Sequence, residues 1–127
     1  MADATYTGGN TTGFASPAGD YLEGRIDLSE ALDLRRPSRY PVRIAGDALT
    51  SSGILPGDIM VVDAALPPAP GRLAVVMMDG RTMIGQLALR RGVWWLQSNK
   101  EDCQPLHIKG DDTEIWAIAV ALVRTDL

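Results

Sequence analysis

The segment from Leu73 to Leu89 constrains the fold of this chain more than any other part of the sequence. An apolar run from Leu73 to Met78 meets the dipeptide Asp79-Gly80, and the residues that follow alternate between two faces as far as Leu89. Asp-Gly is a strong signal for a two-residue turn between antiparallel strands, and a period of two is the pattern of a β-strand. The segment therefore predicts a β-hairpin whose first strand is buried.

Shorter β patterns flank this hairpin. Tyr40, Val42 and Ile44 alternate with more polar neighbours, and a Pro-Gly turn leads into a short apolar strand that Asp63 closes. Many short strands with tight turns and little helix favour an all-β sandwich or partly open barrel. The predicted strands cover residues 40–45, 59–62, 73–78, 81–89, 93–96 and 113–123.

Two segments near the N-terminus depart from the β pattern. Met1–Thr12 is small and polar without periodicity, which predicts a flexible arm. Ser29 is a plausible N-cap for a short helix of about two turns that ends before Pro37. No repeat or composition shift divides the rest, so residues 13–127 are expected to form one domain.

Charge and cysteine content limit the classes of protein that fit. The net charge of −4, with scattered basic residues, argues against duplex nucleic acid as the main partner. A single cysteine forms no internal disulfide, and the sequence shows neither a signal-peptide pattern nor an apolar run of about 18 residues. We therefore expect a soluble cytoplasmic domain with no membrane contact.

Conventional catalytic and metal-binding patterns are weak. His107 lies in a loop-like stretch without an obvious partner, so we interpret it as structural or solvated. Cys103 follows Glu101-Asp102, whose negative charge disfavours a thiolate. One histidine and one cysteine are poor material for a metal site, and no cofactor motif is present.

The tryptophan pattern suggests that one indole is exposed and could contact a partner protein. Adjacent residues of a strand point to opposite faces, so one of Trp94 and Trp95 is expected in the core and the other outward. An outward aromatic residue is typical of interfaces. Trp116 is expected to be a core residue.

The most informative stretch is Gly46-Asp47-Ala48-Leu49, followed by a Pro-Gly turn and the strand Ile59 to Asp63. Its simplest meaning is a β-arch. It also resembles the nucleophile region of the UmuD/LexA serine–lysine autoproteases (peptidase S24), where Gly-Asp-Ser-Met precedes a spacer, Gly-Asp and an apolar strand ending in Asp. The similarity extends from Gly13 to about Val123, including the segment Gly13–Ala18 and the hairpin.

This resemblance implies a LexA/signal-peptidase-like, partly open β-barrel, and it places the serine nucleophile at Ala48 and the lysine base at Gly85. Neither residue can do that chemistry, because the family needs a hydroxyl and a neutral amine. The vestigial turn keeps Gly46 and Asp47, and the gap at Gly85 is expected to be partly filled by neighbouring apolar side chains, Met83 or Leu87. Ser51 and Ser52 follow closely, but the spacer loop is expected to point their hydroxyls away from the nucleophile position.

The scissile bond implied by the resemblance also departs from the family. This chain has Thr12-Gly13 where the family favours Ala-Gly or Cys-Gly. Alanine at the nucleophile position alone would be typical of laboratory inactivation, but inactivated variants do not usually also carry Gly85 and Thr12. The three departures together favour a lineage that lost the reaction.

The resemblance implies partners as well. Only twelve residues precede Gly13, so the repressor branch, with its DNA-binding domain and sequence-specific DNA recognition, is set aside. A UmuD-like protein implies a homodimer in the SOS response that serves as accessory subunit of a UmuC-like Y-family translesion polymerase and contacts that polymerase or the RecA filament. Two alternatives stay open: a peptidase that uses Ser51 or Ser52, or is completed by a partner, and a decoy that forms mixed dimers with an active homologue.

Overall fold

The computed structural model describes residues 22–99, 103–109 and 113–127. The chain falls into two units, Met1–Asp33 and Leu34–Leu127. The predicted arm, Met1–Thr12, lies outside the described residues. No helix within the described ranges is long and apolar enough to cross a membrane.

Helix α1, Leu28–Ala31, lies in the described part of the first unit. The Asp27 side chain caps it by accepting a hydrogen bond from the Glu30 N–H at 3.3 Å. The predictions of Ser29 as the cap and of two turns were therefore wrong. The carboxylate of Asp27 reaches the free N–H first, and left-handed Asp33, with φ of 53°, follows after a single turn.

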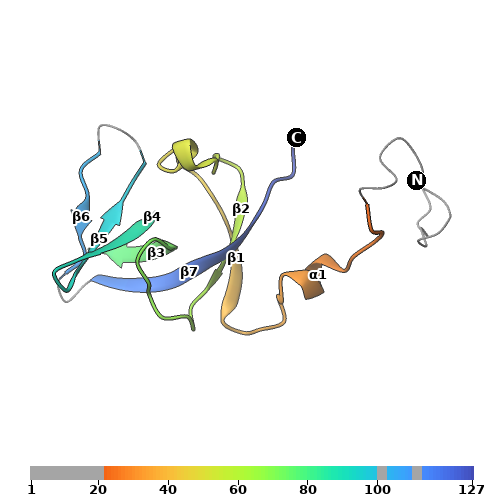
Figure 1. The fold of residues 1–127 in the computed structure, drawn as a ribbon, viewed down its shortest axis with the longest axis horizontal. Coiled ribbons are helices and arrows are strands. Elements are labelled where there is room, and N and C mark those ends of the chain that lie inside the picture. The colour runs from red at the N-terminus through yellow and green to blue at the C-terminus, as the bar shows by residue number, and fades with distance from the viewer. Residues whose placement is uncertain (1–21, 100–102, 110–112) are drawn as a thin grey trace. The chain divides into compact units, whose positions relative to one another are not determined.

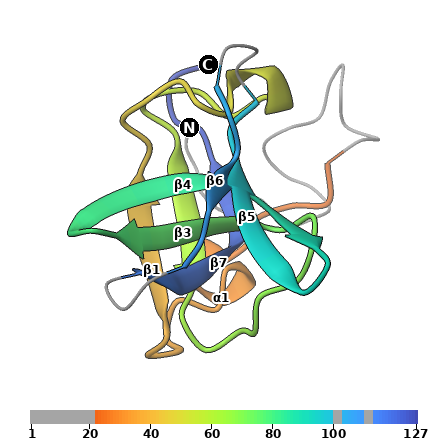
Figure 2. The same cartoon turned by 90° about the vertical axis from the view of Figure 1, so that its left-hand side faces the viewer.

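The second unit is built on a seven-stranded antiparallel sheet with the strand order β1-β2-β7-β3-β4-β5-β6 (Figures 1 and 2). The prediction of a mainly β fold is confirmed. Because β1 and β6 are the two ends of the order, the sheet does not close. The strands are β1 Arg39–Arg43, β2 Ile59–Asp63, β3 Leu73–Met78, β4 Arg81–Arg90, β5 Val93–Gln97, β6 Leu106–His107 and β7 Thr113–Val123.

The predicted hairpin is confirmed. Asp79 and Gly80 both have positive φ, 53° and 78°, as a type I′ turn requires. Arg91 and Gly92 repeat this geometry at 54° and 77° between β4 and β5. These two turns fix the register of the three successive strands β3, β4 and β5.

Strand β7 joins the two halves of the sheet, since its first part pairs with β3 and its second part with β2 (Figure 1). Neighbouring residues on β3, such as Ala74 and Val75, belong to different core clusters, as do Ala117 and Ile118 on β7. Both strands are therefore buried on two faces, which explains why their sequences are nearly continuous apolar runs.

The tryptophans divide largely as expected. Trp94 packs against the core cluster around Leu87, while Trp95 lies on the opposite face and stacks on His107 at 4.7 Å between ring centroids. Trp116 packs against the other cluster but is only partly buried. His107 belongs to β6, so the loop predicted there was wrong in part; a two-residue strand is too short to show a period.

Candidate functional site

The turn that carries Ala48 is anchored at both ends. The Ile44 N–H donates to the Asp58 carbonyl at 2.8 Å, and the Gly57 N–H donates to the Ile44 carbonyl at 2.7 Å. At the other end Leu49 is only 2% exposed and belongs to the core. The turn between these anchors is thus held by backbone pairing on one side and by burial on the other.

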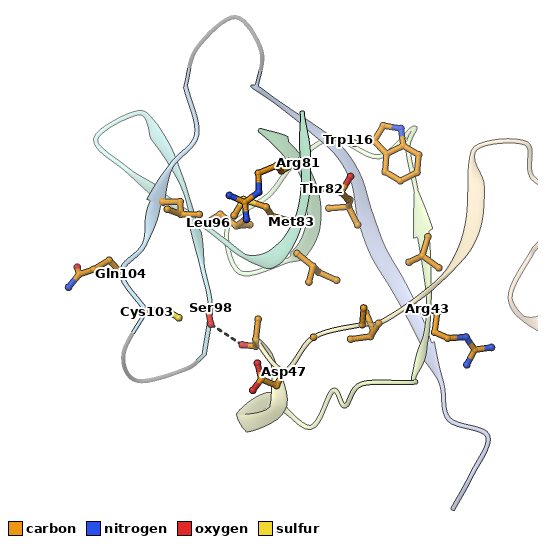
Figure 3. Close-up of a pocket in the computed structure, with 18 residues that line it drawn as sticks. Arg43, Asp47, Arg81, Thr82, Met83, Leu96, Ser98, Cys103, Gln104 and Trp116 are labelled. Carbon is orange, nitrogen blue, oxygen red and sulfur yellow. Dashed lines mark hydrogen bonds between the residues drawn. The ribbon is translucent and has the colours of Figure 1, made fainter. Parts of the chain in front are cut away.

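The carbonyl of Ala48 ties this turn to the end of β5. It accepts a hydrogen bond from the Ser98 hydroxyl at 3.0 Å (Figure 3) and another from the Asn99 N–H at 2.8 Å. These residues lie 50 and 51 positions away from it along the chain. The backbone of Ala48 is therefore fixed by two long-range bonds although its side chain is a single methyl group.

A cleft of about 800 Å³ opens beside Ala48. Arg81, Thr82 and Met83 of β4 lie on one side of it and Asp47 on the other (Figure 3). The deeper lining is apolar and comes from several strands. Its apolar members are Val42, Ile44, Ala45, Ala48, Val75, Met83, Ile84, Leu96, Leu106 and Trp116.

Gly85 is buried in β4, next to Ile84 of the cleft wall. A Cβ added at Gly85 would lie 2.6 Å from the Gln97 carbonyl oxygen and 2.9 Å from Leu96 Cγ. The expectation that Met83 or Leu87 fills a gap at this position is corrected, because β5 occupies that space. The backbone carbonyl cannot rotate away, so position 85 is closed even to a methyl group.

The two serines of the spacer do not line the cleft. The Ser51 hydroxyl donates to the Asn99 carbonyl at 2.9 Å, and the Asn99 side-chain amide donates to the Ser52 hydroxyl. Both serines are exposed and belong to the 3₁₀ turn Thr50–Ser52. Their hydroxyls are engaged beside the end of β5.

Other candidate residues have different surroundings. Cys103 is an exposed free thiol that lines the cleft, whereas His107 is half-buried against Trp95. The bond Thr12-Gly13 lies outside the described residues. Among the residues that the structure describes, no group of three His, Cys, Asp or Glu side chains could hold a metal ion.

Asp58 and Arg124 form an ion pair close to the Ala48 segment, and sequence reasoning did not predict it. Arg124 Nη2 lies 2.6 Å from Asp58 Oδ2, and the same nitrogen donates to the Gly53 carbonyl at 2.6 Å. Hydrogen bonds from Arg124, and then from the Leu55 N–H, lower the pKa of Asp58 to about 2. The pair fastens the end of β7 to the turn that follows the Ala48 segment.

Comparison with known protein families identifies the family to which this chain belongs. A family model described as peptidase S24-like matches residues 5–120, which is most of the chain. The chain belongs to the peptidase S24-like family. The resemblance seen in the sequence is thereby confirmed.

Curated relatives include SamA, ImpA and LexA proteins. Protein SamA of Salmonella typhimurium is 39% identical over 88 residues, covering 68% of this chain and 62% of the relative. Protein ImpA of Escherichia coli is 35% identical over 61% of this chain and 54% of its own length. The LexA repressor of Alcanivorax borkumensis is 25% identical over 81% of this chain and 50% of its own length. The chain thus spans one half to less than two thirds of these relatives.

Proposed function

We propose that the chain is a non-cleaving S24 protein that acts as a dimeric accessory subunit of a UmuC-like translesion DNA polymerase in the response to DNA damage. The absence of cleavage is inferred from the two residues at the nucleophile and base positions. Ala48 brings a methyl group to the cleft, and Gly85 is closed by β5.

No hydroxyl or amine among the described residues that line the cleft replaces the lost side chains. The two hydroxyls that line the cleft are engaged, since Ser98 donates to Ala48 and Thr82 donates to the Met77 sulfur at 3.4 Å. Arginines such as Arg81 stay protonated and cannot accept a proton. A serine–lysine mechanism that lacks both members retains no activated nucleophile.

Exposed apolar side chains support a binding role. Leu55 is 41% exposed and Leu122 is 40% exposed, each at the same end of the sheet as the Asp58–Arg124 pair. The fully buried centre of a protein interface is more apolar than the surrounding surface. The two leucines offer a surface for a second copy or for a polymerase subunit.

Two measurements test this role. Light scattering after size exclusion should give twice the monomer mass, and immobilised protein should retain a purified UmuC-like polymerase. Leu122→Asp should weaken either contact, whereas Leu89→Asp, at a residue 43% exposed on β4, serves as the matched control. A monomer that does not retain the polymerase would contradict the proposal.

The decoy hypothesis gives a different result in one additional assay. Mixed with an S24 homologue that keeps its serine and lysine, a decoy alters the rate at which that homologue cleaves itself. An accessory subunit leaves that rate unchanged and still retains the polymerase. The two roles are therefore separable with the same preparations.

A further inference from the structure

Strands β4, β5 and β6 present a row of polar and aromatic side chains on the face opposite the core cluster around Leu87. The register aligns Ala88 with Trp95 and Trp95 with His107, one residue from each strand. The two rings are parallel within 20° and half-buried, so part of the stack meets solvent. On the other side of Trp95, Ala88 presents only a methyl group, and the Arg90 side chain extends past this pair to Gln97.

Positive charge flanks this stack. Arg90 is exposed, and its Nη2 donates to Gln97 Oε1 at 2.9 Å on the same face. The Ile108 N–H donates to the Trp94 carbonyl at 3.0 Å, which continues the β5–β6 pairing and brings Lys109 beside Val93. Val93 in turn pairs with Arg90. The fold therefore brings two cations from distant parts of the sequence to the same face, with the Arg90 guanidinium toward Gln97 and Lys109 toward Val93.

The composition of this surface differs from that of the chain. The chain has a net charge of −4, yet the described residues of this face include no carboxylate. Asp111 and Asp112, further along the chain, lie outside the described residues. We call this surface the Trp95 face; its members are Gln86, Ala88, Arg90, Val93, Trp95, Gln97, His107 and Lys109.

We propose that the Trp95 face binds single-stranded nucleic acid without sequence preference. A base can stack on the exposed part of the Trp95–His107 pair, and Arg90 and Lys109 can meet the phosphates on either side. Two cations are too few to track the backbone of a duplex, and stacking requires bases that are already unpaired. The amides of Gln86 and Gln97 are held by the Gly71 carbonyl and by Arg90, so the face offers a base stacking and charge but no specific hydrogen-bond readout.

The test uses the full chain and a fluorescent oligothymidylate of about twenty nucleotides, with binding followed by anisotropy at low salt. Trp95→Leu should weaken binding about fivefold or more, because one base loses its stacking partner. Trp95→Phe keeps an aromatic ring and should retain most of the affinity. A melting curve of each variant confirms that it is folded.

Charge is tested separately. Lys109→Gln should reduce the slope of log affinity against log salt by about 0.7, as expected for one lost phosphate contact on a single strand. Arg35→Gln removes the same charge from an exposed residue outside the face and should leave the slope unchanged. Equal effects of these two variants would overturn the proposal.

The remaining outcomes are equally decisive. No binding by the unaltered chain at about 50 mM salt, or unchanged binding by Trp95→Leu, would overturn it. If Trp95→Leu binds the oligothymidylate unchanged but no longer retains the polymerase in the separate retention assay, the face is a protein-docking surface and the nucleic-acid assignment is wrong. The anisotropy assay contains no second protein and no cleavage step, so its failure leaves the proposed function untouched.

Discussion

Replacing Gly85 with alanine adds one methyl group at the point where β4 and β5 converge. The added carbon would lie 2.6 Å from the Gln97 carbonyl oxygen, a backbone atom that moves only if β5 moves. Overpacking a tight interior costs about 1–3 kcal/mol. Removing the extra freedom of a glycine in a strand opposes this by roughly 0.5–1 kcal/mol.

The steric cost is the larger of the two effects. We expect Gly85→Ala to lower the free energy of unfolding by about 1–2 kcal/mol, and the melting temperature by about 4–8 °C for each kcal/mol lost. Thermal and urea denaturation followed by circular dichroism measure both quantities.

Gly46→Ala is the matched control. A Cβ at Gly46 meets nothing within 4 Å, so the same change should leave stability unchanged or slightly raised. If Gly85→Ala is as stable as Gly46→Ala, then β5 does not close the base position and the steric reasoning is refuted.

Three further predictions concern the supports of the site. Asp58→Asn should lower the melting temperature at neutral pH and make the dependence of the melting temperature on acid pH less steep. The pKa of Asp58 is lowered from 3.8 to about 2, so the stability that this carboxylate contributes is present above pH 3.8 and lost as pH falls through about 2. Ser98→Ala should cost about 1 kcal/mol of unfolding free energy by removing one bond to the Ala48 carbonyl, and a cost near zero in urea titrations would mean that Asn99 holds the turn alone. Leu49→Ala should cost about 2–5 kcal/mol in the same titrations, since the side chain is 2% exposed; a surface-like cost would contradict its role as the anchor.

Local chemistry explains which parts of the fold could be predicted from the sequence. The Asp79-Gly80 turn is encoded by two residues whose positive φ few other pairs tolerate. Strand β3 was recognisable because both of its faces are buried. In contrast, β6 is two residues long, and the capping of α1 depended on which of two nearby polar side chains reached the free N–H first.

The site was predictable only in part, for a different reason. Residue types at positions 48 and 85 follow from the family resemblance, but what fills the space around them depends on contacts across the sheet. The approach of Gln97 to Gly85 results from the packing of β5, and Arg124 reaches Asp58 from 66 residues away. Neither contact leaves a periodic or short-range signal in the sequence.

The central claim, that this S24 chain does not cleave itself, is tested most directly by intact mass. The full chain is incubated at alkaline pH, and separately with RecA filaments, alongside an S24 homologue that keeps its serine and lysine as the positive control. We predict an unchanged mass for this chain, and also for Ala48→Ser combined with Gly85→Lys, because β5 leaves no room for the lysine. A fragment of the unaltered chain that begins at Gly13 would contradict the account.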